Sequence, residues 1–143
     1  MTKESQEQLV GMLRKVPLFS TLNDKQLKTM AAGGKNMLFS PGQEIVQEGM
    51  NGVGFFLILD GSVRVRKGKK TLAELKTGDF FGEMSLFDEK PRSATVEAVS
   101  ETRCLAVAAW SFIAMVRSDP DIAVNLMKEL AARLRASNKA LAE

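Results

Sequence analysis

The sequence predicts a mainly β domain with α-helices at both ends, whose strands form an antiparallel sandwich or barrel. Short apolar runs separated by turn residues, mostly glycine, recur at even spacing through residues 35–108. Apolar residues at helical spacing precede and follow that segment. The chain has 143 residues, 45% of them hydrophobic, enough for one domain with a real core. We therefore expect a single domain with N-terminal helices over residues 1–34, a strand-rich centre over 35–108 and C-terminal helices over 109–143.

Two helices are expected before the strands. Residues 4–16 carry apolar side chains near helical spacing, and Pro17 ends that helix. A second helix begins near Asn23, a residue type that caps helices, with Gln26 three positions later as in a capping box. The glycine pair 33–34 ends it.

The strand segments follow in order, each bounded by turn signals. Glycine accepts the positive φ that such turns require, so we interpret Gly42, Gly49, Gly52, Gly61, Gly68 and Gly78 as turn residues. The expected strands lie within residues 36–39, 44–49, 55–61, 62–68, 70–79, 94–100 and 102–109.

Helix returns over residues 110–118. Asp119 then caps a final helix that has Pro120 at its first position and runs almost to Glu143. One apolar series on this helix steps by four, and a second has the alternating three-and-four spacing of a coiled coil: Met127, Leu130, Leu134, Ser137 and Leu141. The stripe could cover the core or pair with a second copy of the chain, and both roles stay open.

The amino-acid composition excludes most of the common catalytic arrangements. There is no histidine, so neither a Ser-His-Asp nor a Cys-His relay can be built. The single cysteine, Cys104, forbids an internal disulfide, and its apolar surroundings predict a small buried residue. Zinc and iron sites of the usual kind are also excluded, and no metal is expected.

The charge and the N-terminus are typical of a cytoplasmic protein. The formal net charge is +3, and no signal peptide or long apolar stretch is apparent. One segment is strongly basic, but it lacks interleaved aromatic residues, so a solvated hairpin is favoured over a nucleic-acid contact. Its basic residues are Arg64, Arg66, Lys67, Lys69 and Lys70.

The stretch FGEMSLFDEKPRSATV, residues 81–96, is typical of an anion-binding site. Gly82 opens one helical turn, whose first N–H groups lack internal partners and can hold a phosphate. Arg92 offers a planar fork that can donate two parallel hydrogen bonds to a phosphate. Glu83 beside a phosphate needs a donor such as a sugar hydroxyl, and together these groups indicate a nucleotide. Alternatively, Glu83 is a solvated acid at a helix N-terminus.

Ser93 and Ala94 complete this stretch. Ser93 adds a short donor next to Arg92, and Ala94 is small enough to let a ligand lie against the strand. The alternative for Arg92 is a surface ion pair with Asp88 or Glu89.

The stretch closely resembles the phosphate-binding cassette, here residues 81–95, of cyclic nucleotide-binding domains. These occur in bacterial catabolite activator proteins, cyclic-nucleotide-dependent kinases and cyclic-nucleotide-gated channels. The flanks VPLFSTLNDKQL, GQEIVQEG, FFLILDGSVRV and SDPDIAVNLMKELAARL resemble the family as well. The resemblance implies a double-stranded β-helix, a jelly-roll-like β-roll, with C-terminal lid or hinge helices.

The resemblance also implies roles for individual residues. The amides around Gly82 to Ser85 and the side chains of Arg92 and Ser93 would hold the cyclic phosphate, and Glu83 would accept the ribose 2′-hydroxyl. The ligand-binding residues would also include Phe81, Met84 and Ala94. RLRASNKAL resembles a region of the bacterial activators that contacts adenine, which makes Ser137 and Asn138 candidate base contacts, from this chain or a neighbouring subunit. If the helix instead folds as a lid, Met127, Leu130 or Leu134 would cap the base.

The predicted function is a sensor of cAMP, or cGMP, whose C-terminal helix changes position when the ligand binds. The chain is not expected to be an enzyme, to bind a metal, a membrane or nucleic acid, or to contain its own output module. A homodimer through the C-terminal helix and an unknown downstream protein are the expected partners. The alternatives are the effector domain of a Crp/Fnr-type regulator without its DNA-binding part, a cyclic dinucleotide as ligand, and a cupin-like enzyme, against which the missing histidines count.

Overall fold

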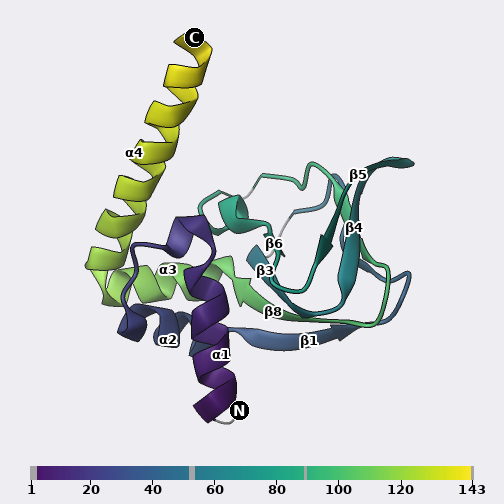
Figure 1. Ribbon diagram of the computed structural model, residues 1–143, viewed down its shortest axis with the longest axis horizontal. Coiled ribbons are helices and arrows are strands. Elements are labelled where there is room, and N and C mark those ends of the chain that lie inside the picture. The colour runs from purple at the N-terminus through teal and green to yellow at the C-terminus, as the bar shows by residue number, and fades with distance from the viewer. Residues whose placement is uncertain (1–2, 52–53, 89, 143) are drawn as a thin grey trace. The chain divides into compact units, whose positions relative to one another are not determined.

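The computed structural model describes residues 3–51, 54–88 and 90–142 (Figure 1). Within these ranges the chain forms eight strands, four α-helices and two short 3-10 helices. The strands are β1 (Lys35–Phe39), β2 (Glu44–Val46), β3 (Gly54–Asp60), β4 (Ser62–Lys67), β5 (Lys70–Lys76), β6 (Phe80–Phe81), β7 (Thr95–Ala98) and β8 (Thr102–Ala108). The helices are α1 (Lys3–Arg14), η1 (Pro17–Phe19), α2 (Asp24–Gly33), η2 (Glu83–Leu86), α3 (Ala109–Ser118) and α4 (Pro120–Ala142).

The strands form two four-stranded antiparallel sheets. Their orders are β1-β8-β3-β6 and β2-β7-β4-β5, so most neighbours in a sheet are distant in sequence. This arrangement, with helices before and after the strands, confirms the predicted antiparallel β-roll (Figure 1). Two elements differ from the expectation: β6 has only two residues and was not predicted, and η1 begins at Pro17, where only a helix end was expected.

The core of the roll follows from the alternation of side chains along each strand. One buried cluster draws on both sheets: Phe39, Val46, Phe56, Ile58, Val63, Phe81, Val96, Ala98 and Cys104. Cys104 is fully buried, as predicted, and its burial raises the pKa of the thiol from 9.0 to about 11. The predicted turn glycines at 42, 49, 61, 68 and 78 all have positive φ, whereas Gly52 lies outside the described residues.

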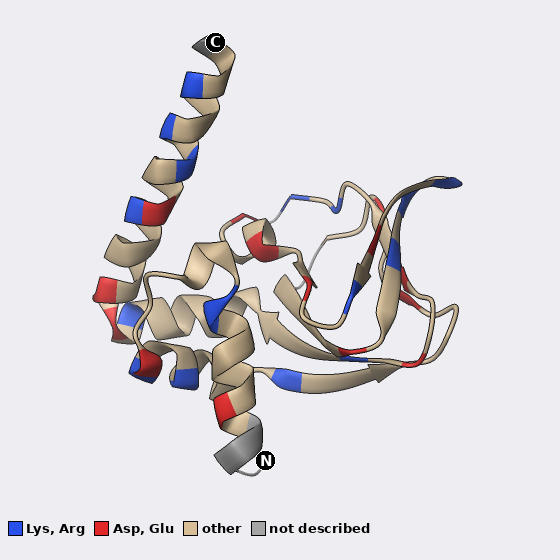
Figure 2. Ribbon diagram, in the orientation of Figure 1, with Lys and Arg blue, Asp and Glu red and all other residues tan. Residues whose placement is uncertain are grey.

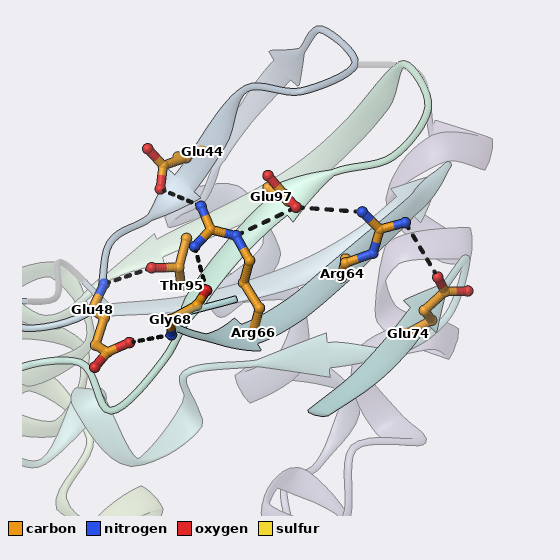
Figure 3. Close-up of polar contacts among 8 residues, drawn as sticks. All are labelled: Glu44, Glu48, Arg64, Arg66, Gly68, Glu74, Thr95 and Glu97. Atoms are coloured by element: carbon orange, nitrogen blue, oxygen red, sulfur yellow. Dashed lines mark hydrogen bonds and ion pairs between the residues drawn. The ribbon is translucent and has the colours of Figure 1, made fainter. Parts of the chain in front are cut away.

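The basic segment is a hairpin, as predicted, and ion pairs connect two arginines of β4 to acids on other strands of the same sheet. β4 and β5 pair antiparallel up to Lys67 and Lys70, and Figure 2 shows basic residues along the hairpin to its turn. On the adjoining strands Glu97 lies 3.4 Å from Arg66 and 3.5 Å from Arg64 (Figure 3). Arg66 also contacts Glu44 at 3.1 Å, and Arg64 contacts Glu74 at 3.7 Å. The two arginines therefore have acidic neighbours in the sheet.

The chain divides into two compact units, of which the helical one comprises Met1–Ala32 and Ile113–Glu143. Within this unit the predicted capping box is present at the start of α2. The N–H of Gln26 donates to Asn23 Oδ1 at 2.8 Å, and the N–H of Asn23 donates to Gln26 Oε1 at 3.0 Å. Gln26 is buried, and its Nε2 also donates to Asp119 Oδ2 at 3.0 Å. This hydrogen bond from Gln26 connects the start of α2 to Asp119, the residue that precedes α4.

The apolar residues of α4 separate into two sets. Ile122 and Leu126 are buried. Met127, Leu134 and Leu141, which recur every seven residues, are 60%, 62% and 85% exposed. The coiled-coil series thus leaves a regular apolar stripe uncovered in a single chain. Along the described residues, no helix combines the length and apolarity needed to span a bilayer.

Candidate functional site

The second compact unit, Gly33–Phe112, contains a pocket of about 240 Å³. Eight predicted site residues line it: Phe81, Gly82, Glu83, Met84, Ser85, Arg92, Ser93 and Ala94. The apolar part of the lining also includes Val46, Val65 and Val96, which the sequence reasoning did not single out. These valines lie on three strands that become neighbours only when the sheet β2-β7-β4-β5 forms. Val65 and Val96 each lie between two polar residues, and this alternation was the available signal for them.

The first part of the predicted cassette is held by a turn and by packing against the core. Gly82, with φ of 81°, turns the chain from β6 into η2, and the N–H of Ser85 closes that turn on the Gly82 carbonyl at 3.1 Å. Leu86 at the end of η2 is buried. The ring of Phe81 stacks on that of Phe56, with centroids 5.0 Å apart. One side of the pocket is therefore anchored to the core of the roll.

Arg92 is fixed through its backbone. Its N–H donates to the carbonyl of Met50, and its own carbonyl accepts from the N–H of Gly49, both at 2.9 Å. Its neighbour Pro91 forms an isolated antiparallel bridge with Asn51. The guanidinium is then directed to the start of β3, where Nη2 donates to the carbonyl of Gly54 at 2.5 Å.

Gly82 makes room for this arginine. A Cβ placed on Gly82 would overlap Nη1 of Arg92 and lie 2.7 Å from the carbonyl oxygen of Gly54. The sequence reasoning assigned the missing side chain to the approach of a ligand. The structure adds a second reason, since glycine at this position lets the guanidinium reach its carbonyl partner.

The electrostatic state of Arg92 is unusual for a surface arginine. The side chain is partly buried, its Nε is a buried donor without a hydrogen-bond partner, and desolvation lowers the pKa of the guanidinium. No ion pair of Arg92 with an acid occurs in the described part of the chain, so the pairing with Asp88 is absent there, and Glu89 lies outside the described residues. A desolvated cation with an unused donor favours an anion at this pocket.

The other lining residues supply both polarity and space. Glu83 and Ser85 are partly buried in the lining, while Met84 and Ser93 are exposed. The N–H groups of Glu83 and Met84 open η2 and have no acceptor inside that helix. The arrangement can bind an anion with Arg92 and present a carboxylate to a hydroxyl of the same ligand.

The predicted base contacts lie in the other compact unit. Leu134, Ser137 and Asn138 are exposed residues of α4 and are not part of the pocket lining. Their contact with a ligand, from this chain or from a second copy, stays a prediction.

Comparisons with known proteins point to one family. Residues 37–119 match the family model described as "Cyclic nucleotide-binding domain". The chain is 36% identical over 124 residues to a cyclic AMP receptor protein of Thermus thermophilus, and 37% identical over 90 residues to a cGMP-dependent protein kinase of Toxoplasma gondii. It also superposes on the crystal structure of the N-terminal domain of a transcriptional regulator from Streptomyces coelicolor, with a TM-score of 0.84 and 30% identity.

The matched shares differ between these proteins. The aligned regions cover 83% of this chain with the Thermus receptor, 63% with the kinase and 91% with the Streptomyces domain. The chain spans 57% of the Thermus receptor and 9% of the kinase, but 94% of the Streptomyces domain. The similarity to the two longer proteins therefore concerns one part of each.

Proposed function

The chain belongs to the cyclic nucleotide-binding domain family, and from this premise we propose that it is a sensor that binds a purine cyclic mononucleotide, with cAMP as the preferred ligand. The observation that carries the proposal is the state of Arg92. This arginine lines the pocket, is partly desolvated and keeps a buried donor unused. A cyclic phosphate supplies both the missing charge and the missing acceptor.

Each lining residue then has a chemical role. Arg92 and the N–H groups of Glu83 and Met84 bind the phosphate, and Ser93 adds a hydroxyl donor. The carboxylate of Glu83 accepts the ribose 2′-hydroxyl, which keeps this acid away from direct contact with the phosphate charge. The three lining valines, Val46, Val65 and Val96, offer an apolar surface to the sugar.

The C-terminal helix supplies the base contacts and the output. Ser137 and Asn138 contact the base, or Leu134 caps it, and α4 changes position when the ligand binds. The exposed stripe of Met127, Leu134 and Leu141 pairs with the same stripe of a second copy, which gives a homodimer. A ligand shifts such an equilibrium only through its different affinities for the two states.

A second candidate is the effector domain of a Crp/Fnr-type regulator. The observation that favours it is the match to the Streptomyces domain, which this chain covers almost completely. The pocket and its ligand are the same in this case, and only the output differs.

Calorimetric titration tests the proposal. The chain is titrated with cAMP, cGMP and a cyclic dinucleotide, alongside Arg92→Ala, Arg92→Lys and the control Arg103→Ala, which removes an exposed arginine of β8. We expect one cAMP per chain, unchanged binding in the control, and at least about 30-fold weaker binding in Arg92→Ala, equivalent to about 2 kcal/mol or more. Arg92→Lys keeps the charge and loses the planar fork, so an intermediate affinity is expected.

Two outcomes contradict the proposal. Absence of binding by all three nucleotides refutes the sensor function, and wild-type affinity in Arg92→Ala refutes the assigned site. Tighter binding of cGMP than of cAMP would retain the site and correct the ligand. Sedimentation of the same samples with and without cAMP tests the dimer, which Leu134→Glu should dissociate.

A further inference from the structure

A second hollow, of about 280 Å³, lies on the same unit of the protein and is not part of the Arg92 pocket. We call it the Trp110 hollow; its lining includes Lys35, Met37, Gly54, Phe56, Ala106 and Trp110. Its volume is near the lower end of the usual range for small-molecule sites, about 300–1,000 Å³. A site of this size suits a small organic molecule better than a helix or a peptide.

The register of the sheet explains why there is space here. Across β1, β8 and β3 the residues Lys35, Ala106 and Phe56 lie side by side in one row. Alternate residues of a strand share a face, so Ala108 and Gly54, which pair with each other, lie on the same face as this row. The floor is therefore made of alanine and glycine, and larger side chains stand only around it.

Gly54 cannot fill the floor with a side chain. Its φ is +138°, and a Cβ there would overlap the carbonyl oxygen of Val107. The small residue at this position is thus required by the backbone of the sheet.

The rim leaves apolar surface in contact with water. Trp110 is 78% exposed and Met37 is 39% exposed, while Phe56 on the inner side is buried. Covering an indole and a thioether side chain with an apolar ligand removes that surface from water, which the hydrophobic effect favours. The body of the ligand should accordingly be a hydrocarbon chain or ring.

The charge of the rim defines the head group. Lys35 is the one charged residue in the lining, it is exposed, and no ion pair involves it in the described ranges. An ammonium group beside an apolar hollow attracts a single negative charge. We propose that the Trp110 hollow is a second ligand site, which binds a small apolar monocarboxylate with its hydrocarbon body on the Ala106 floor and its carboxylate at Lys35.

The test uses the only tryptophan of the chain as a reporter. Since the sequence contains one Trp, the tryptophan emission comes from Trp110 alone, a residue that lines this hollow. Octanoate is the probe, because it does not absorb where the indole does, and 1-octanol is the uncharged control. We expect a saturable blue shift of the emission with octanoate, and equilibrium dialysis should find one octanoate per chain.

Three variants assign the site. Lys35→Gln should weaken octanoate binding at least tenfold and leave octanol binding unchanged, whereas Lys69→Gln in the hairpin turn should bind octanoate as the wild type does. Ala106→Leu fills the floor and should abolish the binding of both probes. Circular dichroism checks that the Ala106→Leu variant is folded. Lys35→Gln alters an exposed residue, so this variant tests the proposal even if Ala106→Leu does not fold.

The proposal is overturned if dialysis finds no bound octanoate, or if the emission changes without saturation. Equal losses in the two lysine variants would also overturn it, since binding would then depend only on overall charge. Because no cyclic nucleotide is present in these titrations, their failure would leave the function of the Arg92 pocket untouched.

Discussion

Replacing Gly82 with alanine is expected to destabilise the protein far more than its position in a surface turn suggests. Two costs add. Alanine must adopt φ near +81°, which costs about 1–2 kcal/mol for a residue with a Cβ. The new Cβ also meets Arg92 Nη1 and the Gly54 carbonyl oxygen at 2.7 Å. The arginine can move away, but the carbonyl belongs to the backbone of β3 and cannot do so cheaply.

The second cost includes the loss of a hydrogen bond. If Arg92 moves, its donation to the Gly54 carbonyl is broken, and hydrogen bonds of charged groups contribute about 1.5–3 kcal/mol. The total expected loss in the free energy of unfolding is therefore about 2.5–5 kcal/mol. A matched control is Gly42→Ala, whose φ of +85° is nearly the same but whose Cβ would meet nothing within 4 Å. That variant should lose only the backbone part, about 1–2 kcal/mol.

Unfolding in guanidinium chloride, followed by circular dichroism, measures the free energy of unfolding of both variants under the same conditions. The difference between them isolates the contact around Arg92 and should be about 1.5–3 kcal/mol. A difference below about 0.5 kcal/mol would show that the guanidinium and the Gly54 carbonyl accommodate a methyl group freely, and the account of Gly82 given above would be wrong.

Three further results are expected. Burial raises the pKa of the Cys104 thiol from 9.0 to about 11, so this thiol should resist a thiol reagent at pH 8 until denaturant is added. Between pH 9 and 11 the thiol ionises only in the unfolded state, so the free energy of unfolding should fall as the pH rises through this range. The fall should be smaller in Cys104→Ala. Gln26→Ala removes two side-chain hydrogen bonds, one from the N–H of Asn23 and one to Asp119. Thermal melts should therefore show a free energy of unfolding lower by about 2 kcal/mol, against about 1 kcal/mol for Asn23→Ala. Glu97→Gln breaks two partly exposed ion pairs and should cost about 0.5–1 kcal/mol in urea unfolding at low salt, with a smaller loss in 0.5–1 M NaCl; an equal loss at high salt would contradict an electrostatic origin.

Local features of this fold could be predicted from the sequence because they depend on neighbours along the chain. The capping box of Asn23 and Gln26 and the turn glycines are of this kind. The eight residues from Phe81 to Ala94 that line one pocket also lie within a short stretch, so their pattern could be recognised in the sequence, although Arg92 is held in place by the distant residues Gly49 and Met50. β6 escaped prediction because two residues carry no period.

Contacts between distant segments could not be predicted in this way. Arg92 meets Gly54 across 38 positions, and that contact depends on the register with which β3 enters its sheet. The same is true of Val46 and Val65 in the pocket, and of Ala106 in the Trp110 hollow. Sequence periodicity shows which face of a strand is apolar, but not which strand lies beside it.

Gly54 contributes to both cavities, as part of the lining of the Trp110 hollow and as the hydrogen-bond partner of Arg92 in the other pocket. Its carbonyl holds the guanidinium of the Arg92 pocket, and its bare α-carbon belongs to the floor of the Trp110 hollow. Anyone who wishes to re-engineer this protein as a biosensor should leave that position alone, because a substitution there would alter both responses at once. Met37 and Ser93 each border a single cavity and offer independent handles for tuning one response without the other.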